Sequence, residues 1–467
     1  MSENTILLRN KSVNNQGPSL PSALVELGNI VSDDLCHRCG SCLGICPTDV
    51  LGRDDEDYPT IKNLDACINC NLCVKVCPGD EIDFPKYYKK IHEQEFQAEK
   101  LHGYFQKAYL GHALDQDMRY RTTSGGVVTA IFSQLFSSGA IDGAIIVKAD
   151  EQVKWRGQPA VVSSVEEFIS GAKSKYVIAP TNEAIAYIRK NPGRYAVVGL
   201  PCQIHGLQKM QKVNKPLRDR IVLSFGIFCH AAVEHDPLKY IWIKREEEAQ
   251  GEGKQIERLI TRLGKHPGIP TLKLSDQSER HLYFPYSKKY RPNSTEMLNV
   301  LYRLYTPARC FTCFDATSEL ADISVGDPWM REPEKSIKFH NGYTFVLART
   351  ARGMEALRQA QKQEAISLYP LDDKQALKCN TKMAVEKRHR AFYLLQQREK
   401  QGLRIPRYNL EIPALKLKDK LKVKLNLLTH YFCFHHPHRL TALKLALSPL
   451  GYYALLLNHI RRRLQKR

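Results

Sequence analysis

Hydrophobic residues between about 122 and 148 recur first at helical spacing and then at strand spacing. Apolar positions between Val127 and Phe136 follow a three-to-four-residue period, and Gly139 ends this segment. Thr122–Ser124 offer N-caps, and Gly125–Gly126 opens the helix. The apolar run at 143–148 then predicts a buried strand.

A second α/β unit follows farther along the chain. Short apolar runs at 195–200 and 221–228 predict two strands, and residues 203–212 between them predict a helix. Strands joined in this way lie parallel in one sheet. Cys202 and Cys229 each follow a strand end, so we expect them at the same sheet edge, where open α/β sheets bind ligands.

The N-terminal region carries two runs of the form C-x-x-C-x-x-C-x-x-x-C-P. This is the ligand spacing of bacterial ferredoxins with two [4Fe–4S] clusters, in which the fourth cysteine of each run binds the other cluster. One predicted ligand set is Cys36, Cys39, Cys42 and Cys77; the other is Cys67, Cys70, Cys73 and Cys46.

Zinc and disulfides are the alternatives for these cysteines. Zinc takes four ligands from two C-x-x-C pairs and has no use for a third, evenly spaced cysteine. Residues 1–30 do not resemble a signal peptide, so we expect reduced thiols in a cytoplasmic protein. Two [4Fe–4S] clusters remain the favoured interpretation, with zinc as a minor alternative.

Four later cysteines predict a third cluster. Cys202 and Cys229 lie at the expected sheet edge, and Cys310 and Cys313 form a C-x-x-C before a further strand that ends near Asp327. Four cysteines that converge at one edge favour another [4Fe–4S] cluster. The alternative is that Cys202 and Cys229 are ordinary buried thiols.

Positive charge is concentrated at the C-terminus. The chain has 467 residues and a net charge of +20, and residues 378–467 contain 21 Lys and Arg against 4 Asp and Glu. The remainder is therefore close to neutral. Two or three domains are expected at this length.

The basic C-terminal region has two interpretations. Its apolar stretch at 440–460 is interrupted by Lys444, Pro449 and Gly451, which argues against a membrane-spanning helix. A basic, apolar tail can lie on an anionic membrane surface, which would place the protein on the inner face of the membrane. It can equally pack on the body with its charges solvated. No recognisable nucleic-acid-binding module accompanies the charge, so no nucleic-acid partner is expected.

Several stretches in order resemble the beta subunits of coenzyme F420 hydrogenases and dehydrogenases, which form one family. The matching stretches are TTSGGVVT at 122–129, AKSKY at 172–176, GLPCQIHG at 199–206, GIFCH at 226–230, RCFTCF at 309–314 and DISVGDPW at 322–329. They cover roughly residues 103–350. The N-terminal ferredoxin domain is similar to the arrangement in F420H2 dehydrogenase and sulfite-reductase-linked members.

The resemblance implies a non-covalent FAD and supports the third cluster on Cys202, Cys229, Cys310 and Cys313. It implies that FAD binds near Ser124, Gly125, Gly126 and Thr129, with Lys173, Lys175, Tyr176 and Asp327 near the flavin or its substrate. From the residues alone, Ser-Gly-Gly at a helix start suits a pyrophosphate, although such a pair is often only a tight turn.

The expected fold is α/β with an added α+β ferredoxin-like domain. The predicted divisions are a mobile leader at 1–28, the two-cluster domain at 29–88, a flavin region at 103–185, a region with the third cluster at 186–376 and a basic helical tail at 377–467.

The predicted function is two-electron exchange at FAD with a hydride donor or acceptor such as F420, coupled to single-electron transfer through the clusters to a redox partner protein. Two alternatives stay open: a ferredoxin-dependent reductase of an organic substrate, and an electron-transfer subunit without its own substrate.

Overall fold

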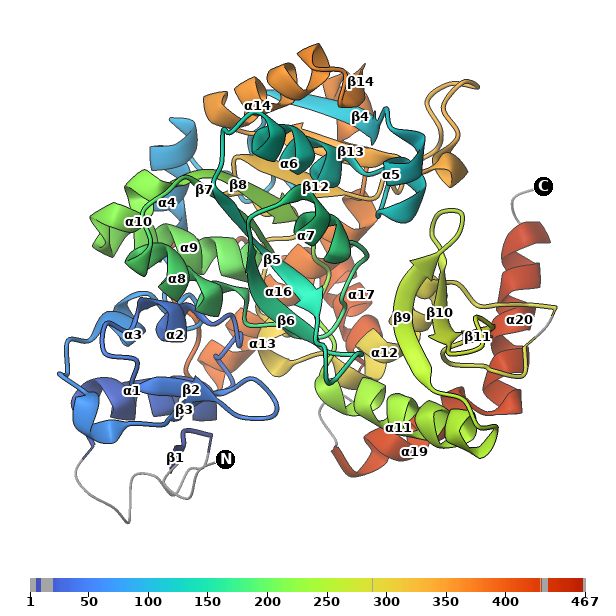
Figure 1. Ribbon diagram of the computed structural model, residues 1–467. Coiled ribbons are helices and arrows are strands. Elements are labelled where there is room, and N and C mark those ends of the chain that lie inside the picture. The colour runs from blue at the N-terminus through green and yellow to red at the C-terminus, as the bar shows by residue number, and fades with distance from the viewer. Residues whose placement is uncertain (1–5, 10–19, 288, 429, 431–435, 465–467) are drawn as a thin grey trace.

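A mixed eight-stranded sheet forms the centre of the body. The computed structural model describes residues 6–9, 20–287, 289–428, 430 and 436–464 (Figure 1). The strand order is β14-β4-β13-β12-β8-β7-β5-β6. The strands are β4 (Lys107–Ala113), β5 (Gly143–Ala149), β6 (Gly157–Val162), β7 (Tyr195–Gly199), β8 (Ile221–Ile227), β12 (Ile323–Gly326), β13 (Thr344–Ala348) and β14 (Ile366–Leu371).

The four middle strands β5, β7, β8 and β12 are parallel, and the outer strands are antiparallel to their neighbours. The predicted strand–helix–strand unit is therefore present as β7, α9 (Pro201–Val213) and β8. Because β7 and β8 are parallel, their carboxyl ends meet at one edge of the sheet.

Two apolar layers cover the two faces of this sheet. On one face α6 (Val127–Ser137), α7 (Val165–Ser170) and α14 (Ala351–Lys362) enclose a core that includes Ala196 and Phe225. On the other face α9 and α16 (Thr381–Lys400) pack over Val197 with apolar residues of the N-terminal domain. The N-terminal domain thus shares a core with the body.

The other helices between residues 84 and 376 are mostly short. They are α4 (Phe84–His92), α5 (Gln116–Arg121), α8 (Ile185–Lys190), α10 (Lys215–Arg220), α11 (His235–Gly251), α12 (Ser294–Tyr305), α13 (Ala308–Phe311) and α15 (Asp373–Ala376). A second, three-stranded antiparallel sheet contains β9 (Ile256–Leu263), β10 (Ile269–Leu274) and β11 (Glu279–His281) and lies beside α11 and α12.

The N-terminal domain contains α1 (Ser22–Ser32), α2 (Ser41–Ile45), α3 (Leu72–Lys75), β2 (Leu51–Arg53) and β3 (Pro59–Ile61). Strand β1 (Ile6–Leu7) pairs with β3, and Leu24 and Leu27 of α1 are buried. The expectation of a mobile leader over 1–28 is therefore wrong for β1 and for the residues of α1. Apolar residues at those positions pack on the cluster-binding segment, while 1–5 and 10–19 lie outside the described residues.

The predicted tail boundary at 377 is also wrong. Helix α16 packs inside the body, where Lys387 and Arg388 are each 2% exposed. Arg388 pairs with the buried Glu319, and Arg407 donates to Asp80 of the N-terminal domain at 2.7 Å. These partners explain how a basic stretch became part of the core.

Among the described residues, α16 is followed by α17 (Leu417–Leu428), α19 (His436–Ala446) and α20 (Pro449–Leu464). Within the described residues no single helix is long and apolar enough to cross a membrane. Residues His438–Ala446 and Pro449–Arg461 meet that length and composition only as a pair, which is bent by 63°.

Buried polar contacts fix the N-terminal domain on the body. Arg38 donates to Glu234 at 2.6 Å, and the Arg38 side chain is 1% exposed. The backbone N–H of Asn182 donates to the carbonyl of Cys39 at 3.0 Å, and Lys209 Nζ donates to the carbonyl of Cys77 at 3.0 Å. Both carbonyls belong to predicted cluster ligands, so these contacts set the position of the ligand loops relative to the body.

We predict that Glu234→Ala lowers the free energy of unfolding by about 3 kcal/mol, because it leaves the Arg38 guanidinium buried without its counter-charge. Chemical denaturation followed by circular dichroism measures this loss. The matched control is Asp117→Ala, whose pair with Arg121 is 65–71% exposed and whose loss is worth less than about 1 kcal/mol. Equal losses in the two variants would contradict the assigned role of Arg38.

Candidate functional site

Two cavities divide the eight N-terminal cysteines into two groups of four. Cys36, Cys39, Cys42 and Cys77 line one cavity. Cys46, Cys67, Cys70 and Cys73 line the other. In each group the fourth cysteine comes from the other sequence run, as the ferredoxin crossover requires. We call these groups the inner set and the outer set; their ligation of iron remains a prediction.

The inner set has no exposed cysteine, whereas the outer set reaches the surface at one of its four. Burial, followed by the neighbouring Cys77, raises the pKa of the Cys36 thiol to about 12. Cys70 is exposed, and Ile68 beside it is 65% exposed. The two sets are neighbours, because Cys73 is among the sulfurs that help burial to raise the pKa of Cys42.

The four later cysteines also come together. Cys202 lies in the first turn of α9 just after β7, Cys229 follows β8, and Cys310 and Cys313 lie in and just after α13. Burial, then Cys39, Cys313, Cys229 and Cys310, holds the pKa of Cys202 well above its usual value. We call these four the body set. The influence of Cys39 on Cys202 shows that the body set adjoins the inner set.

In the described residues, no group of three or more His, Cys, Asp or Glu side chains has an arrangement that could hold a single metal ion. The donors in all three sets are four thiols each, the ligand type and number that a [4Fe–4S] cluster takes. The residues present therefore fit such clusters.

A buried cation from α16 lies against the body set. Lys387 Nζ donates to the carbonyl of Cys229 at 2.7 Å. Burial opposes its charge, but Cys313, Cys229, Cys310 and Asp315 outweigh burial and raise the pKa of Lys387. No sequence pattern pointed to this residue, since a lysine in a basic stretch is typical of a solvated helix face.

A buried acid–base pair lies near the same cysteines and near Lys387. His205 of α9 contacts Asp315 at 2.9 Å between Nε2 and Oδ2. Burial raises the pKa of Asp315, but the hydrogen bond and charge of His205 and the charge of Lys387 leave it lowered. His37, between the inner and body sets, has its pKa lowered by burial and by the charge of Arg309.

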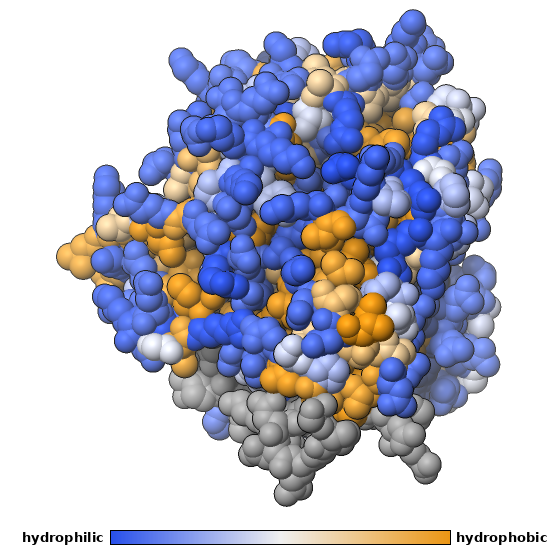
Figure 2. Space-filling model, turned by 90° about the vertical axis from the view of Figure 1, so that its left-hand side faces the viewer, coloured by the Kyte–Doolittle hydropathy of each residue, from blue (hydrophilic) through white to orange (hydrophobic). Residues whose placement is uncertain are grey.

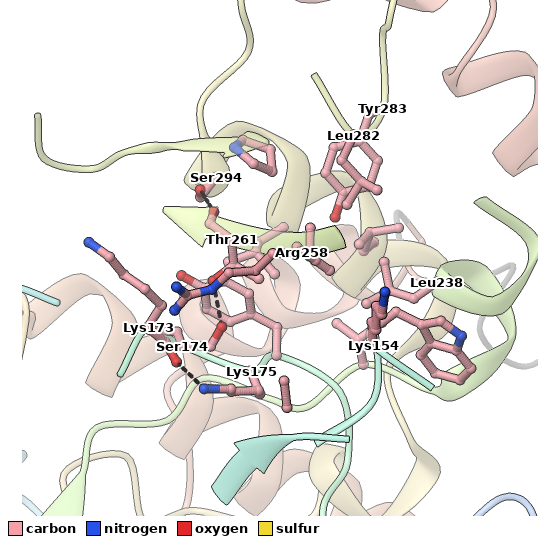
Figure 3. Close-up of a pocket in the computed structure, with 18 of the residues that line it drawn as sticks. Lys154, Lys173, Ser174, Lys175, Leu238, Arg258, Thr261, Leu282, Tyr283 and Ser294 are labelled. Carbon is pink, nitrogen blue, oxygen red and sulfur yellow. Dashed lines mark hydrogen bonds between the residues drawn. The ribbon is translucent and has the colours of Figure 1, made fainter. Parts of the chain in front are cut away.

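A cavity of about 180 Å³ lies between the β5–β6 loop, the segment 170–176 and the small sheet (Figure 3). The predicted residues Lys173, Lys175 and Tyr176 line it. Burial, followed by the charge of Arg258, lowers the pKa of Lys175 to about 7. Burial, then Arg262 and Arg258, lowers the pKa of Lys173 to about 8.

The lining of this cavity combines cations with an apolar wall. Lys154 and Arg258 join the two predicted lysines, and in Figure 3 Lys154 and Lys173 lie on opposite sides. Trp155, Leu259, Leu282, Leu298 and Leu301 supply apolar surface. Among the described residues, no Asp or Glu lines the cavity. Arg258 was missed from the sequence because it lies in an ordinary strand pattern, Ile256–Leu263, far from the family-like stretches.

A second hollow adjoins this cavity at Lys173 and is lined by Ser124, Gly125 and Gly268. Ser124 donates to Asp327, and Arg262 pairs with Asp327 at 3.1 Å. The structure thus brings together Ser124, Asp327 and the lysine region, and Arg262 is a second residue that sequence reasoning missed. Arg258 lines the first cavity and Arg262 the second hollow, and a register shift in β9 between Ile260 and Leu263 separates the two arginines.

The loop before α6 differs from its predicted capping. Ser124, Gly125 and Gly126 have φ values of 53°, 83° and 78°. Gly126 is the N-cap, and no side chain caps the helix. The expectation of a hydroxyl N-cap is therefore wrong. Thr129 is buried within α6 and lines neither cavity, so the structure does not bring it to the candidate site.

The dipeptide Ala232–Val233 connects the 180 Å³ cavity with the body set through its backbone hydrogen bonds. Val233 lines the cavity, and its backbone N–H donates to the carbonyl of Tyr176 at 3.0 Å. The backbone N–H of the preceding residue, Ala232, donates to the sulfur of Cys310. Burial, then Cys229 and Tyr176, raises the pKa of Tyr302, so Tyr302 lies near both a body-set cysteine and a residue that lines the cavity.

Comparison with known proteins identifies the parts of the chain. A 4Fe-4S dicluster domain model matches residues 29–95. Together with the α/β body, this match defines an iron–sulfur oxidoreductase. Models for the coenzyme F420 hydrogenase/dehydrogenase beta subunit match residues 108–186 with the N-terminal part and 193–374 with the C-terminal part. The chain belongs to this family, as the sequence resemblance predicted.

Three relatives show how far the similarity extends. The coenzyme F420-dependent sulfite reductase of Methanocaldococcus jannaschii is 28% identical over 78% of this chain, which spans 52% of that protein. A coenzyme F420 hydrogenase subunit beta of Methanococcus voltae is 26% identical over 65% of this chain and 99% of its own length. The corresponding protein of Methanosarcina barkeri, also a coenzyme F420 hydrogenase subunit beta, is 24% identical over 62% of this chain and 93% of its own length.

A solved structure has a similar fold. A chain of the F420-reducing [NiFe] hydrogenase complex of Methanosarcina barkeri aligns with 68% of this chain and 99% of its own length, at 20% identity and a TM-score of 0.50. The family models stop at residue 374, so the family assignment ends before the C-terminal helices α16 to α20.

We predict that Gly125→Ala destabilises the protein by more than about 2 kcal/mol, because an alanine with positive φ is strained. Its Cβ would also lie 2.7 Å from the carbonyl oxygen of Gly342. Gly139→Ala is the control: Gly139 has φ +65°, but its Cβ would meet nothing within 4 Å. Thermal unfolding of both variants measures the difference, and equal destabilisation would show that Gly342 does not confine the loop.

Proposed function

We propose that the protein is an FAD-containing iron–sulfur oxidoreductase that exchanges two electrons at the cavity and single electrons along the three cysteine sets. The observation that carries this proposal is a continuous series of neighbouring groups. It runs from the cavity through the body set and the inner set to the outer set, which is exposed at Cys70.

The cationic cavity supports FAD as the bound group. Lys154, Lys173, Lys175 and Arg258 line a site without carboxylates among the described residues, which suits a diphosphate. The adjoining hollow at Gly125 extends the site, and the apolar wall suits a ring system. The residues present therefore fit a flavin dinucleotide.

The composition of the body set supports the third cluster. Four thiols of one buried group fit a [4Fe–4S] cluster, and Lys387 supplies a positive charge beside them. A bound flavin supplies hydride exchange, and [4Fe–4S] clusters supply single-electron transfer.

The chain's own residues hold these groups in order and exclude water. Arg258 and the lysines orient an anionic ligand, and Lys175 loses a proton near neutral pH because its pKa is about 7. Lys387 offsets the negative charge of the body set, and the Arg38–Glu234 pair keeps the inner set against it.

The exposed surface at the outer set is the proposed contact for a redox partner protein. Ile68 and Cys70 lie on it, and the face on the side of the N-terminal domain shows apolar patches among polar side chains (Figure 2). The chain spans about half of its sulfite reductase relative, so we propose that it works with another oxidoreductase subunit. The names of the relatives make F420 the proposed hydride carrier.

An electron-transfer subunit without its own substrate is the second candidate. The exposed Cys70 favours it, because this feature serves electron exchange with a partner whether or not the cavity binds a substrate.

We predict about twelve irons per anaerobically purified chain, four for each [4Fe–4S] cluster, and one FAD. The double variant Cys202→Ser/Cys229→Ser loses about four irons and keeps the rest, as measured by iron and sulfide analysis. Cys379→Ser, which alters a buried thiol outside the three sets, is the control and keeps all. About eight irons in the unaltered protein would remove the third cluster, and absence of flavin would leave only the second candidate.

Lys387→Met is predicted to lower the midpoint potential of the body-set cluster, because it removes a positive charge beside the ligands. Reductive titration followed by electron paramagnetic resonance measures the potential. Lys387→Arg retains the charge and should keep most of the unaltered potential. Lys382→Met changes an exposed lysine on the same helix and should leave the potential unchanged. An unchanged potential in Lys387→Met with full iron content would exclude the role of this charge.

A further inference from the structure

Helix α17 exposes a straight stripe of leucines to solvent. Leu417, Leu421, Leu425 and Leu428 are 83%, 58%, 56% and 68% exposed. They recur at intervals of four, four and three residues, so they lie above one another on one side of the helix. This row of large aliphatic side chains is not needed to hold α17 on the protein, because the opposite side of the helix packs on the body.

The opposite side of α17 is attached to the body. Val423 is 6% exposed, and at about 100° per residue it lies roughly opposite the leucine stripe. Asp419 influences the pKa of His389 on α16. The helix is therefore held on the protein with its leucines directed outward.

Lysines flank the leucine stripe on both sides. Lys418 and Lys422 lie along one border and Lys424 along the other, and all three are exposed. Across residues 413–467 there are twelve Lys and Arg and one Asp. A groove on another protein would have to bury these ammonium groups, whereas a lipid surface lets their aliphatic stems lie along the apolar layer and their charges meet headgroups.

We propose that α17 binds the surface of an anionic lipid bilayer, with the leucine stripe inserted at the acyl boundary and its lysines at the headgroups. The occupant is the bilayer surface, because charge complementarity selects anionic lipid and the aliphatic row supplies the apolar term. The protein then lies peripherally on the inner face of the membrane, and no helix needs to cross it.

Co-sedimentation with vesicles tests this surface on the full-length holoprotein. We expect binding to vesicles of phosphatidylcholine mixed with phosphatidylglycerol, weaker binding at high salt, and little binding to phosphatidylcholine alone. The variant L421S/L425S should bind about tenfold more weakly, since two inserted side chains are lost. K418Q/K422Q/K424Q should lose the preference for anionic vesicles.

Matched variants separate this surface from general changes of polarity or charge. L377S/L403S changes two leucines that are 49% and 50% exposed outside the C-terminal helices, and K244Q/K335Q/K362Q removes three exposed lysines elsewhere. Both should bind like the unaltered protein, and unchanged circular dichroism and visible absorption verify that all variants are folded and loaded.

Two results would overturn the proposal. The first is failure of the unaltered protein to bind anionic vesicles. If L421S/L425S also loses a co-purifying protein, α17 serves a protein partner instead of a membrane. The second is equal vesicle binding by L421S/L425S and the unaltered protein. Neither result affects the iron and flavin content, so the proposed redox function is tested separately.

Discussion

The docking of the N-terminal domain on the body is the constraint on which the rest of the structure depends. Arg38, 1% exposed, crosses the boundary to Glu234, and Asp57 of the same domain contacts His235 at 3.2 Å. Charges buried in this way are stabilising only in good geometry with their partners present. These ion pairs hold the inner cysteine set against the body set. Two separate domains joined by a flexible linker would not keep the two sets together.

The cysteine sets impose a second requirement, which is positive charge in the protein interior. Lys387 and Arg309 are both buried beside the body set, and the pKa of each is raised in part by neighbouring sulfurs. Arg309 also donates to Tyr408, which follows α16. The family match ends at residue 374. The segment after it is therefore needed to complete the surroundings of the body-set cysteines, which lie within the matched residues.

Local patterns predicted the centre of the fold well. The periods around Val127–Phe136 and 195–228 correspond to α6, β7, α9 and β8, and their parallel order explains why Cys202 and Cys229 meet. The patterns failed where long-range partners decide burial. Arg388 is buried because Glu319 lies beside it, and Arg262 reaches the site because the small sheet brings it to Asp327; neither partner is close in sequence.

The central claim is that the three cysteine sets hold three clusters in one electrically connected series. Electron paramagnetic resonance of the fully reduced protein tests it most directly, because neighbouring reduced clusters split one another's signals. We predict split signals from three interacting clusters, and loss of the splitting between the body and inner sets in Cys202→Ser/Cys229→Ser. Independent, unsplit signals in the unaltered protein, or signals from two clusters only, would contradict the claim.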